Sequence, residues 1–256
     1  MVSFNFWGQL VFVCLLSLSP KVSLIPIPVM CDESSATSTP DNPYKNNVKS
    51  LLIRLFPIAY KSTGYYSVVG ADTPDAVYGL FLCRGDVPAD DCGKCVVEAS
   101  SQIEERCPGS KVAISWFDDC LLRYSNSTDS PFYYRGVDIN KQIIPDVERY
   151  STALLGLMQD LAQAMPNQSS KRFVTKQVNL TAVSTLYGLQ QCIPNISTAD
   201  CNMCLRDAIS LLQGCCLRSR SARILLDSCI VWFDIKPFYN STTPPLPPPP
   251  PPTSSG

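Results

Sequence analysis

The sequence predicts an α+β protein of two tandem domains, in which each domain packs two helices on several short antiparallel strands. The first observation is a frame of five cysteines that occurs twice, with gaps of eight, two, eleven and twelve residues. The frame runs from Cys83 to Cys120 and, 109 residues later, from Cys192 to Cys229. The second observation is that helical periodicity and short strand-like segments follow the same order in both copies. The chain is therefore interpreted as an internal duplication.

The first domain is predicted to begin with an amphipathic helix. Apolar residues recur at helical spacing from Val48 to Ala59, and Pro57 is expected to kink or end this helix. Residues 64–70 and 76–81 are short, rich in aromatic or β-branched side chains and bounded by glycine. These features predict two strands.

A second helix is predicted to carry Cys92 and Cys95, because two aspartates suit its first turn and a Pro-Gly pair breaks the chain after it. The alternating segment that follows is interpreted as one strand over residues 112–124. Asp118 and Asp119 on such a strand point to opposite faces. They are therefore not expected to share a substrate as the paired carboxylates of glycosidases do.

The second domain repeats this order. A helix is predicted over residues 147–161, and strand material over residues 173–189. An S-x-x-D start signal at Ser197 opens the helix that carries the second pair of neighbouring cysteines. The last strand is expected to run over residues 223–233.

Composition suggests where the domains begin and end. Residues 1–26 are interpreted as a secretory signal peptide, because their apolar run is too short to span a membrane; a retained anchor is the alternative. The first domain is placed at 27–134, a linker at 135–145 and the second domain at 146–238. The proline-rich tail, 239–256, is expected to form extended polyproline II structure. No membrane span is expected in the mature chain.

Cysteine and sequon counts favour an oxidising, extracellular compartment. Of thirteen cysteines, Cys14 lies in the expected signal peptide, and the other twelve divide evenly between the domains. Five N-x-S/T sequons agree, since a glycan is added only on exposed, lumenal loops. Their asparagines are Asn126, Asn167, Asn179, Asn195 and Asn240. The formal net charge of −1 gives no reason to expect a nucleic-acid partner.

The cysteine spacing C-x8-C-x2-C and two further segments resemble a known plant family. The segments run from Tyr78 to Cys83 and from Trp116 to Tyr124. Together they resemble the ginkbilobin-homologous domain, which is also called the stress-antifungal domain. Two tandem copies are similar to the cysteine-rich repeat secretory proteins and to the ectodomains of cysteine-rich receptor-like kinases. The resemblance covers residues 31–234, and it implies a five-stranded antiparallel sheet, two helices and three disulfides in each domain.

The resemblance also implies a disulfide pattern. Its pairs are Cys31–Cys107, Cys83–Cys92, Cys95–Cys120, Cys192–Cys201 and Cys204–Cys229. The second domain has no cysteine equivalent to Cys31, and Cys215 and Cys216 stand side by side instead. Three states stay open for these two cysteines: a strained bond between them, a link to another chain, or buried thiols.

Mannose-binding members of the family use an Asn just after the first cysteine, an Arg six residues before the last cysteine and a Glu five residues after it. The first domain has Asp32, Ile114 and Ser125 at these positions, so its sugar site is expected to be lost. The second domain has Arg223 and Asp234 at two of these positions, but the sequence shows no residue equivalent to the Asn. These two side chains could hold sugar hydroxyls by charge-assisted hydrogen bonds. A surface ion pair between neighbouring strands is the favoured alternative.

The other chemical motifs are better explained by structure than by catalysis. Cys92 and Cys95 form a C-x-x-C pair like that of thioredoxins, but no thioredoxin-like order of strands and helices surrounds it. The cysteine gaps and the absence of His disfavour a zinc site. The absence of His also removes the usual general base of nucleophilic enzymes. No enzyme activity, metal or other cofactor is therefore expected.

The resemblance implies a binding function in the plant apoplast, in defence or stress signalling. The first hypothesis is recognition of another extracellular protein, such as a receptor ectodomain, by surfaces that the disulfides keep rigid. The second is a mannose-binding, antifungal, lectin-like protein that contacts a cell-wall glycan through Arg223 and Asp234. The third is an oxidoreductase that acts through Cys92.

Overall fold

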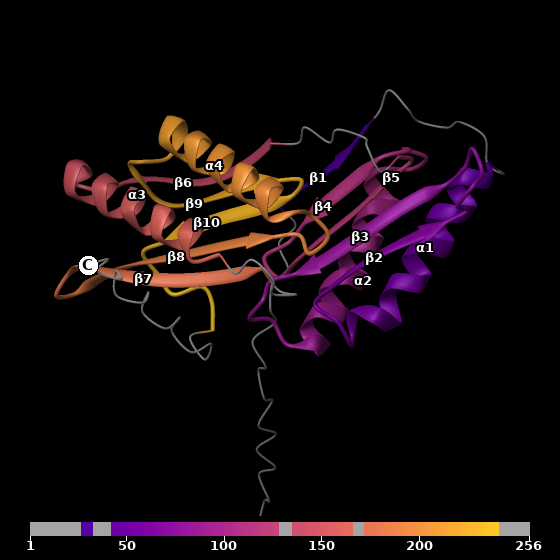
Figure 1. The fold of residues 1–256 in the computed structure, drawn as a ribbon, viewed down its shortest axis with the longest axis horizontal. Helices are drawn as coiled ribbons and strands as arrows, with labels where there is room; N and C mark the ends of the chain where they lie inside the picture. Colours follow the sequence, from indigo (N-terminus) through magenta and orange to yellow (C-terminus); the bar gives the residue numbers. More distant parts are fainter. Residues whose placement is uncertain (1–26, 33–41, 128–134, 166–171, 241–256) are drawn as a thin grey trace, which may run out of the picture.

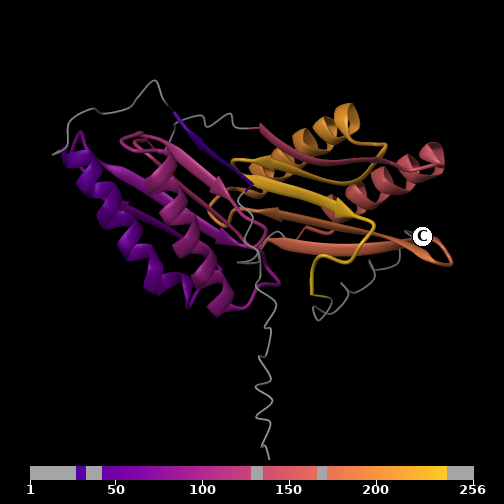
Figure 2. The same ribbon diagram turned by 180° about the vertical axis from the view of Figure 1, so that it is seen from behind.

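The computed structural model describes residues 27–32, 42–127, 135–165 and 172–240. The expected signal peptide, the sequon at Asn167 and the tail from residue 241 lie outside these ranges. The described chain forms two domains that lie side by side, each a five-stranded antiparallel sheet covered on one face by two helices (Figure 1). The predicted α+β class is therefore confirmed. The view from behind shows both helix pairs on the outer sides of the molecule (Figure 2).

In the first domain, the strand order is β1-β4-β5-β3-β2 and every neighbouring pair is antiparallel. Its elements are β1 (Ile27–Cys31), α1 (Pro43–Ala59), β2 (Gly64–Val69), β3 (Val77–Cys83), α2 (Ala89–Arg106), β4 (Ala113–Trp116) and β5 (Cys120–Ser125). Asn42 caps α1, because its side chain accepts a hydrogen bond from the backbone N–H of Tyr44. Pro57 lies in the last turn of α1, and the helix ends at Ala59.

In the second domain, the strand order β6-β9-β10-β8-β7 repeats that of the first. Its elements are β6 (Arg135–Ile143), α3 (Val147–Gln163), β7 (Phe173–Thr181), β8 (Ser184–Cys192), α4 (Thr198–Cys215), β9 (Ser219–Leu226) and β10 (Cys229–Asp234). Ser197 caps α4 by accepting a hydrogen bond from the backbone N–H of Asp200, as the start signal predicts. The two domains therefore share one topology, as expected for a duplication.

Each long strand predicted after the second helix of a domain is instead a hairpin. β4 and β5 divide residues 112–124, and β9 and β10 divide residues 223–233. Both arms of each hairpin keep the same alternation of side chains, so periodicity alone cannot reveal where the chain reverses. Asp118 and Asp119 consequently lie in the turn between β4 and β5, and not on opposite faces of a strand.

The prediction of a linker at residues 135–145 is also wrong, because β6 occupies most of this segment and pairs with β9. Ile139 on β6 lies opposite Ala222, just as Cys31 on β1 lies opposite Ala113 in the first domain. Ile139 packs against the core of the second domain. β6 therefore takes the place of β1, with an apolar side chain where the first domain has a half-cystine.

The helices pack closely on the sheets at two equivalent glycines. A Cβ atom on Gly79 of β3 would overlap the side chain of Leu51 on α1. Gly188 of β8 occupies the same place in the second domain, where a Cβ atom would lie 2.8–2.9 Å from three side chains of α3. Each glycine thus allows the first helix of its domain to lie directly on the sheet.

A third apolar cluster joins the two domains. Most of its side chains come from the sheet faces that point away from the helices, and Ile193 directly follows β8. The buried members are Leu80, Leu82, Ile114, Trp116 and Leu121 of the first domain and Ile193 and Leu225 of the second. Because burying apolar surface favours association, this cluster holds the domains together as one body.

Candidate functional site on the second domain

Arg223 and Asp234 meet on the face of the second sheet that points away from its helices. Arg223 on β9 lies opposite Trp232 on β10, and Asp234 lies opposite Ser221 in the next row. Because side chains alternate along a strand, all four point to the same face. They line an open concavity of about 300 Å³.

Asn140 on β6 extends this row. It lies opposite Ser221 and lines the same concavity. Because Ile139 takes the strand position of Cys31, Asn140 takes the position of Asp32, which directly follows Cys31, the first cysteine of its domain. The expectation that the second domain has no residue equivalent to the family's Asn is therefore wrong. Counting from a cysteine could not find Asn140, because that cysteine is absent.

Arg223 is held by carboxylates from both domains. Its Nε and Nη2 donate to Asp138 Oδ2 at 3.1 and 2.7 Å, and its Nη1 donates to the Asp118 carboxylate of the first domain. Its guanidinium carbon lies 4.5 Å from the ring centroid of Trp232. The expected ion pair between Arg223 and Asp234 is therefore not formed, and Asp138 on β6 is the partner of Arg223 on a neighbouring strand. Three of the five guanidinium N–H groups are engaged, which leaves two as donors.

The other polar groups of the concavity also keep hydrogen-bonding capacity. The Oδ1 of Asn140 accepts from the backbone N–H of Gln142 at 3.0 Å, and no described residue accepts a hydrogen bond from its amide nitrogen. The Oδ1 of Asp234 accepts from the backbone N–H of Lys236 at 2.9 Å, and its other oxygen remains an acceptor. Donors and acceptors that converge on one concave surface can bind a polyhydroxylated ligand.

The end of the described chain packs against the same face. The ring of Phe238 stacks on Trp232 with centroids 4.1 Å apart. The hydroxyl of Tyr239 donates to a backbone oxygen of β7, and burial raises its pKa to about 12. The backbone N–H of Asn240 donates to Asp86 of the first domain at 2.8 Å. Tyr239 and Asn240, which were expected to open the tail, therefore belong to the folded part and help to fix Trp232.

Two arginines link the domains in a reciprocal way. Arg123 of the first domain donates to the backbone oxygen of Asp227 at 2.9 Å, and Arg223 of the second binds Asp118. Asp118 and Asp227 occupy the same position in the hairpin turns of their domains. Each turn is therefore held by an arginine from the other domain, and these contacts rim the apolar cluster.

Burial shifts the pKa values of the charged groups in this junction. It raises the pKa of Asp227 although Arg123 lies close, and it lowers the pKa of Arg123. It also raises the pKa of Asp119, although Arg84 Nη1 lies 3.3 Å from that carboxylate. Desolvation therefore outweighs the attraction of the opposite charge at both aspartates.

The structure joins the cysteines in the pairs that the family resemblance implies, and it adds a bond between neighbours. The bonds are Cys31–Cys107, Cys83–Cys92, Cys95–Cys120, Cys192–Cys201, Cys204–Cys229 and Cys215–Cys216. Cys92 and Cys95 thus bond to different partners and form no C-x-x-C dithiol, which contradicts the oxidoreductase hypothesis. In the described ranges, no cluster of three His, Cys, Asp or Glu side chains is arranged to hold a metal ion.

The structure describes four of the five sequon asparagines and four helices. The four sequon asparagines that the structure describes, Asn126, Asn179, Asn195 and Asn240, are all exposed. Of the four helices described, none has the length and apolar character that crossing a bilayer requires.

Comparisons with known proteins agree with the duplication. A family model described as salt stress response/antifungal matches residues 30–127 and again residues 138–236. The tandem DUF26 ectodomain of the Arabidopsis thaliana cysteine-rich receptor-like protein PDLP8, solved by crystallography, superimposes with a TM-score of 0.73. The superposition covers 84% of this chain and 100% of that one at 23% sequence identity, so this likeness concerns the fold.

Three relatives show the range of proteins that carry this pair of domains. Cysteine-rich receptor-like protein kinase 25 of Arabidopsis thaliana is 38% identical over 82% of this chain, but over only 32% of its own length. The antimicrobial ginkbilobin-2-like protein of Castanea crenata is 34% identical over 81% of this chain and 87% of that protein. Cysteine-rich repeat secretory protein 38 of Arabidopsis thaliana is 31% identical over 81% and 83%.

The chain spans about a third of the length of four of the receptor kinases that it matches. It spans more than four fifths of the antimicrobial and secretory relatives. On the strength of two family matches and these identities, the chain belongs to the plant salt stress response/antifungal family, as a cysteine-rich protein with two tandem copies of the domain.

Proposed function

We propose that this chain is a secreted, glycosylated binding protein of plant defence or stress responses, and that its second domain binds mannose-type glycans. One observation carries the choice of ligand: Asn140, Arg223 and Asp234 line one concavity. These are an Asn, an Arg and a carboxylate at the three positions that mannose-binding family members use. Asp in place of Glu shortens the carboxylate arm by one methylene and leaves its charge unchanged.

The surroundings of Arg223 favour recognition of a neutral sugar. Asp118 and Asp138 compensate the guanidinium charge, so the side chain offers oriented N–H donors without an unpaired cation. Its position is fixed from both domains and by Trp232. A site whose side chains are already ordered loses less conformational entropy when a ligand binds.

Secretion to the apoplast rests on several independent features. The first 26 residues have the pattern of a signal peptide. Six disulfides suit an oxidising compartment, and the described sequons are exposed. A similar protein is named as secretory and another as antimicrobial. The proposed role is binding, and no catalytic step is part of it.

A glycan array probed with the purified secreted protein tests this function. The wild-type protein is expected to bind mannose-terminated glycans, and Asn140→Ala and Arg223→Ala are each expected to abolish most of the signal. Arg220→Ala is the matched control, because Arg220 lies on the same strand but contacts Gln142 outside the concavity. An array on which the folded wild-type protein is silent would remove the sugar-binding proposal.

A second candidate function is recognition of another extracellular protein, and exposed tyrosines on a sheet edge favour it. β2 is an outer strand, with Tyr65 and Tyr66 exposed by 40% and 37%. Tyrosine is enriched in protein interfaces, and an open strand edge offers unpaired backbone groups to a partner. If the partner is a receptor-like protein, this edge of the first domain is therefore the proposed contact surface.

Binding to a panel of plant receptor-like ectodomains tests the second candidate. Replacing both Tyr65 and Tyr66 by Ser is expected to weaken any specific complex at least tenfold. Val183→Ser, at an exposed site in the turn after β7, should leave the affinity unchanged. Equal binding by both variants would show that this edge is not the contact surface.

A further inference from the structure

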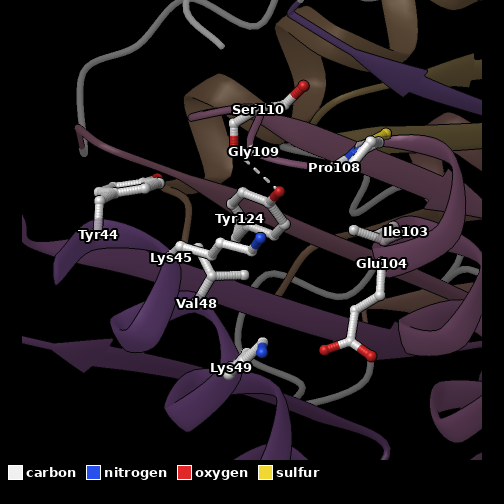
Figure 3. A pocket seen from close by; sticks show the side chains of 11 residues that line it. Tyr44, Lys45, Val48, Lys49, Ile103, Glu104, Pro108, Gly109, Ser110 and Tyr124 are labelled. Atoms are coloured by element: carbon white, nitrogen blue, oxygen red, sulfur yellow. Dashed lines mark hydrogen bonds between the residues drawn. The ribbon is translucent and has the colours of Figure 1, made fainter. Parts of the chain in front are cut away.

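A pocket of about 220 Å³ lies in the first domain, apart from the concavity on the second. Figure 3 shows it between α1 and the end of α2, with the rings of Tyr44 and Tyr124 among its lining residues. Val48 and Ile103 add apolar surface. Pockets for drug-sized ligands measure roughly 300–1,000 Å³, so this one suits a smaller molecule with one or two rings.

The phenol groups in the pocket are neutral and oriented. Tyr44 donates to the backbone oxygen of Lys111, and Tyr124 donates to that of Ser110 at 3.0 Å. Burial raises the pKa of both tyrosines far above physiological pH, so neither becomes an anion. Since both O–H groups are used, the pocket offers ring faces and phenol oxygens rather than free donors.

The positive charge at the pocket comes from α1. Lys45 and Lys49 are one turn apart, both line the pocket, and neither forms a hydrogen bond or ion pair in the part of the chain that the structure describes. Glu104 of α2 stands across from them in Figure 3 and carries the one carboxylate among the lining side chains. The pocket therefore combines an apolar, aromatic interior with two uncompensated ammonium groups and one carboxylate, a net positive charge.

The second domain shows that the fold does not require this arrangement. Tyr44 and Tyr150 are equivalent, because both are buried near the start of their helices and both phenols donate to a backbone oxygen beyond the second helix. Counting from them, Ser151 and Leu155 replace Lys45 and Lys49. Leu155 packs against the core of its domain.

The cysteine frame extends this comparison to the rest of the pocket. Gln213, Leu217 and Phe233 stand where the first domain has Glu104, Pro108 and Tyr124. Phe233 belongs to the core of the second domain, and Leu217 packs against it. The three charged groups and the phenol of Tyr124 are thus particular to the first domain, and the second has uncharged side chains at all four positions.

We propose that this pocket is a binding site for a small aromatic carboxylate, with the ring between Val48, Ile103 and Tyr124 and the carboxylate at Lys45 and Lys49. The ring would bury apolar surface against an aromatic side chain. The two ammonium groups would supply charge-assisted hydrogen bonds to the anion. Binding at this site is independent of the sugar site on the second domain.

Calorimetric titration of the intact secreted protein with naphthoate, and with its neutral amide as a second probe, tests the proposal. The wild-type protein is expected to bind naphthoate at one saturable site, and the amide about tenfold more weakly. Lys45→Glu with Lys49→Glu should weaken naphthoate at least tenfold and leave the amide almost unchanged. Lys61→Glu is the matched control, because Lys61 is exposed in the same domain but does not line the pocket.

Three results would overturn the proposal. One is the absence of saturable naphthoate binding by the folded wild-type protein. The second is naphthoate binding that the double variant retains. The third is an equal loss in Lys61→Glu, which would reveal a non-specific effect of net charge. Since all three lysines are on the surface, every variant is expected to fold, and mannose binding by the same samples is a separate readout.

Discussion

The two domains share one fold, yet they use the same sheet face differently. In the first domain, Ile114 is fully buried in the apolar cluster between the domains. Its counterpart in the second domain is Arg223. This side chain lies on the equivalent face of the second sheet, where it lines an open concavity. The first copy thus uses this position to dock its partner domain, and Asp118 of the docked domain in turn holds Arg223 of the second.

The domains differ in their third disulfide as well. Cys31–Cys107 ties β1 to the end of α2 across 76 positions of the chain. The second domain has Ile139 in place of Cys31, and Cys216 bonds to its neighbour Cys215. A cross-link stabilises mainly by restricting the unfolded chain, so a bond between neighbours contributes little. The first domain is therefore stabilised by a long-range disulfide. The second depends instead on packing and on its contact with the first domain.

The largest expected effect separates these two bonds. Replacing Cys31 and Cys107 by Ala is expected to lower the free energy of unfolding by about 4 kcal/mol, from the entropy of a loop of that length. Replacing Cys215 and Cys216 by Ala should cost no more than about 1 kcal/mol, mainly from lost packing at the buried Cys216. Chemical denaturation of both variants measures the difference. Equal losses would mean that loop length does not explain the role of the bonds.

The equivalent glycines provide the next comparison. Gly79→Ala forces the whole Leu51 side chain to move and is expected to cost about 2–3 kcal/mol. Gly188→Ala has slightly more room, and one of its neighbours is the flexible end of Met158, so about 1 kcal/mol is expected. Thermal unfolding of the two variants tests this order, and a larger loss for Gly188→Ala would contradict the packing described here.

Two adjacent glutamines on β8 test the contact between the domains. Gln191 donates to the backbone oxygen of Cys83 across the junction at 3.0 Å, and Gln190 donates to Met158 within its own domain at 2.8 Å. Gln191→Leu is expected to cost about 1–2 kcal/mol, because it leaves a buried carbonyl without this donor. Gln190→Leu should cost less, since it also removes a buried oxygen that has no hydrogen-bond partner. Urea denaturation measures both, and the reverse order would argue against the junction contact.

The smallest expected effect concerns pH. Burial raises the folded-state pKa of Asp119, so protonation favours the folded state. The contribution of Asp119 to stability should therefore grow as the pH falls through its folded pKa toward its unfolded value near 4. Compared with Asp119→Asn, the wild-type protein is expected to gain stability between pH 7 and pH 4.5 in urea denaturation. A relative loss over that interval would reverse the sign assigned to this carboxyl.

The sequence predicted the helices, the repeat and the family because cysteine spacing and helical periodicity are local signals. It did not reveal the turn at Asp118 and Asp119, since an antiparallel reversal preserves the alternation on both arms. β6 was hidden for another reason, because an outer strand carries many polar residues and resembles a linker. Asn140 was missed with it: only the register of β6 against β9 places Asn140 beside Arg223.

The central claim of the comparison is that the second domain, and not the first, binds mannose at the proposed site. The two tryptophans that the structure describes are suited to test this, because Trp116 is fully buried and Trp232 lines the concavity. The decisive measurement is intrinsic fluorescence during titration with methyl α-mannoside. We expect a saturable change in the wild-type protein and in Arg220→Ala, and none in Asn140→Ala. A flat titration of the folded wild-type protein, or an unchanged response in Asn140→Ala, would contradict this account.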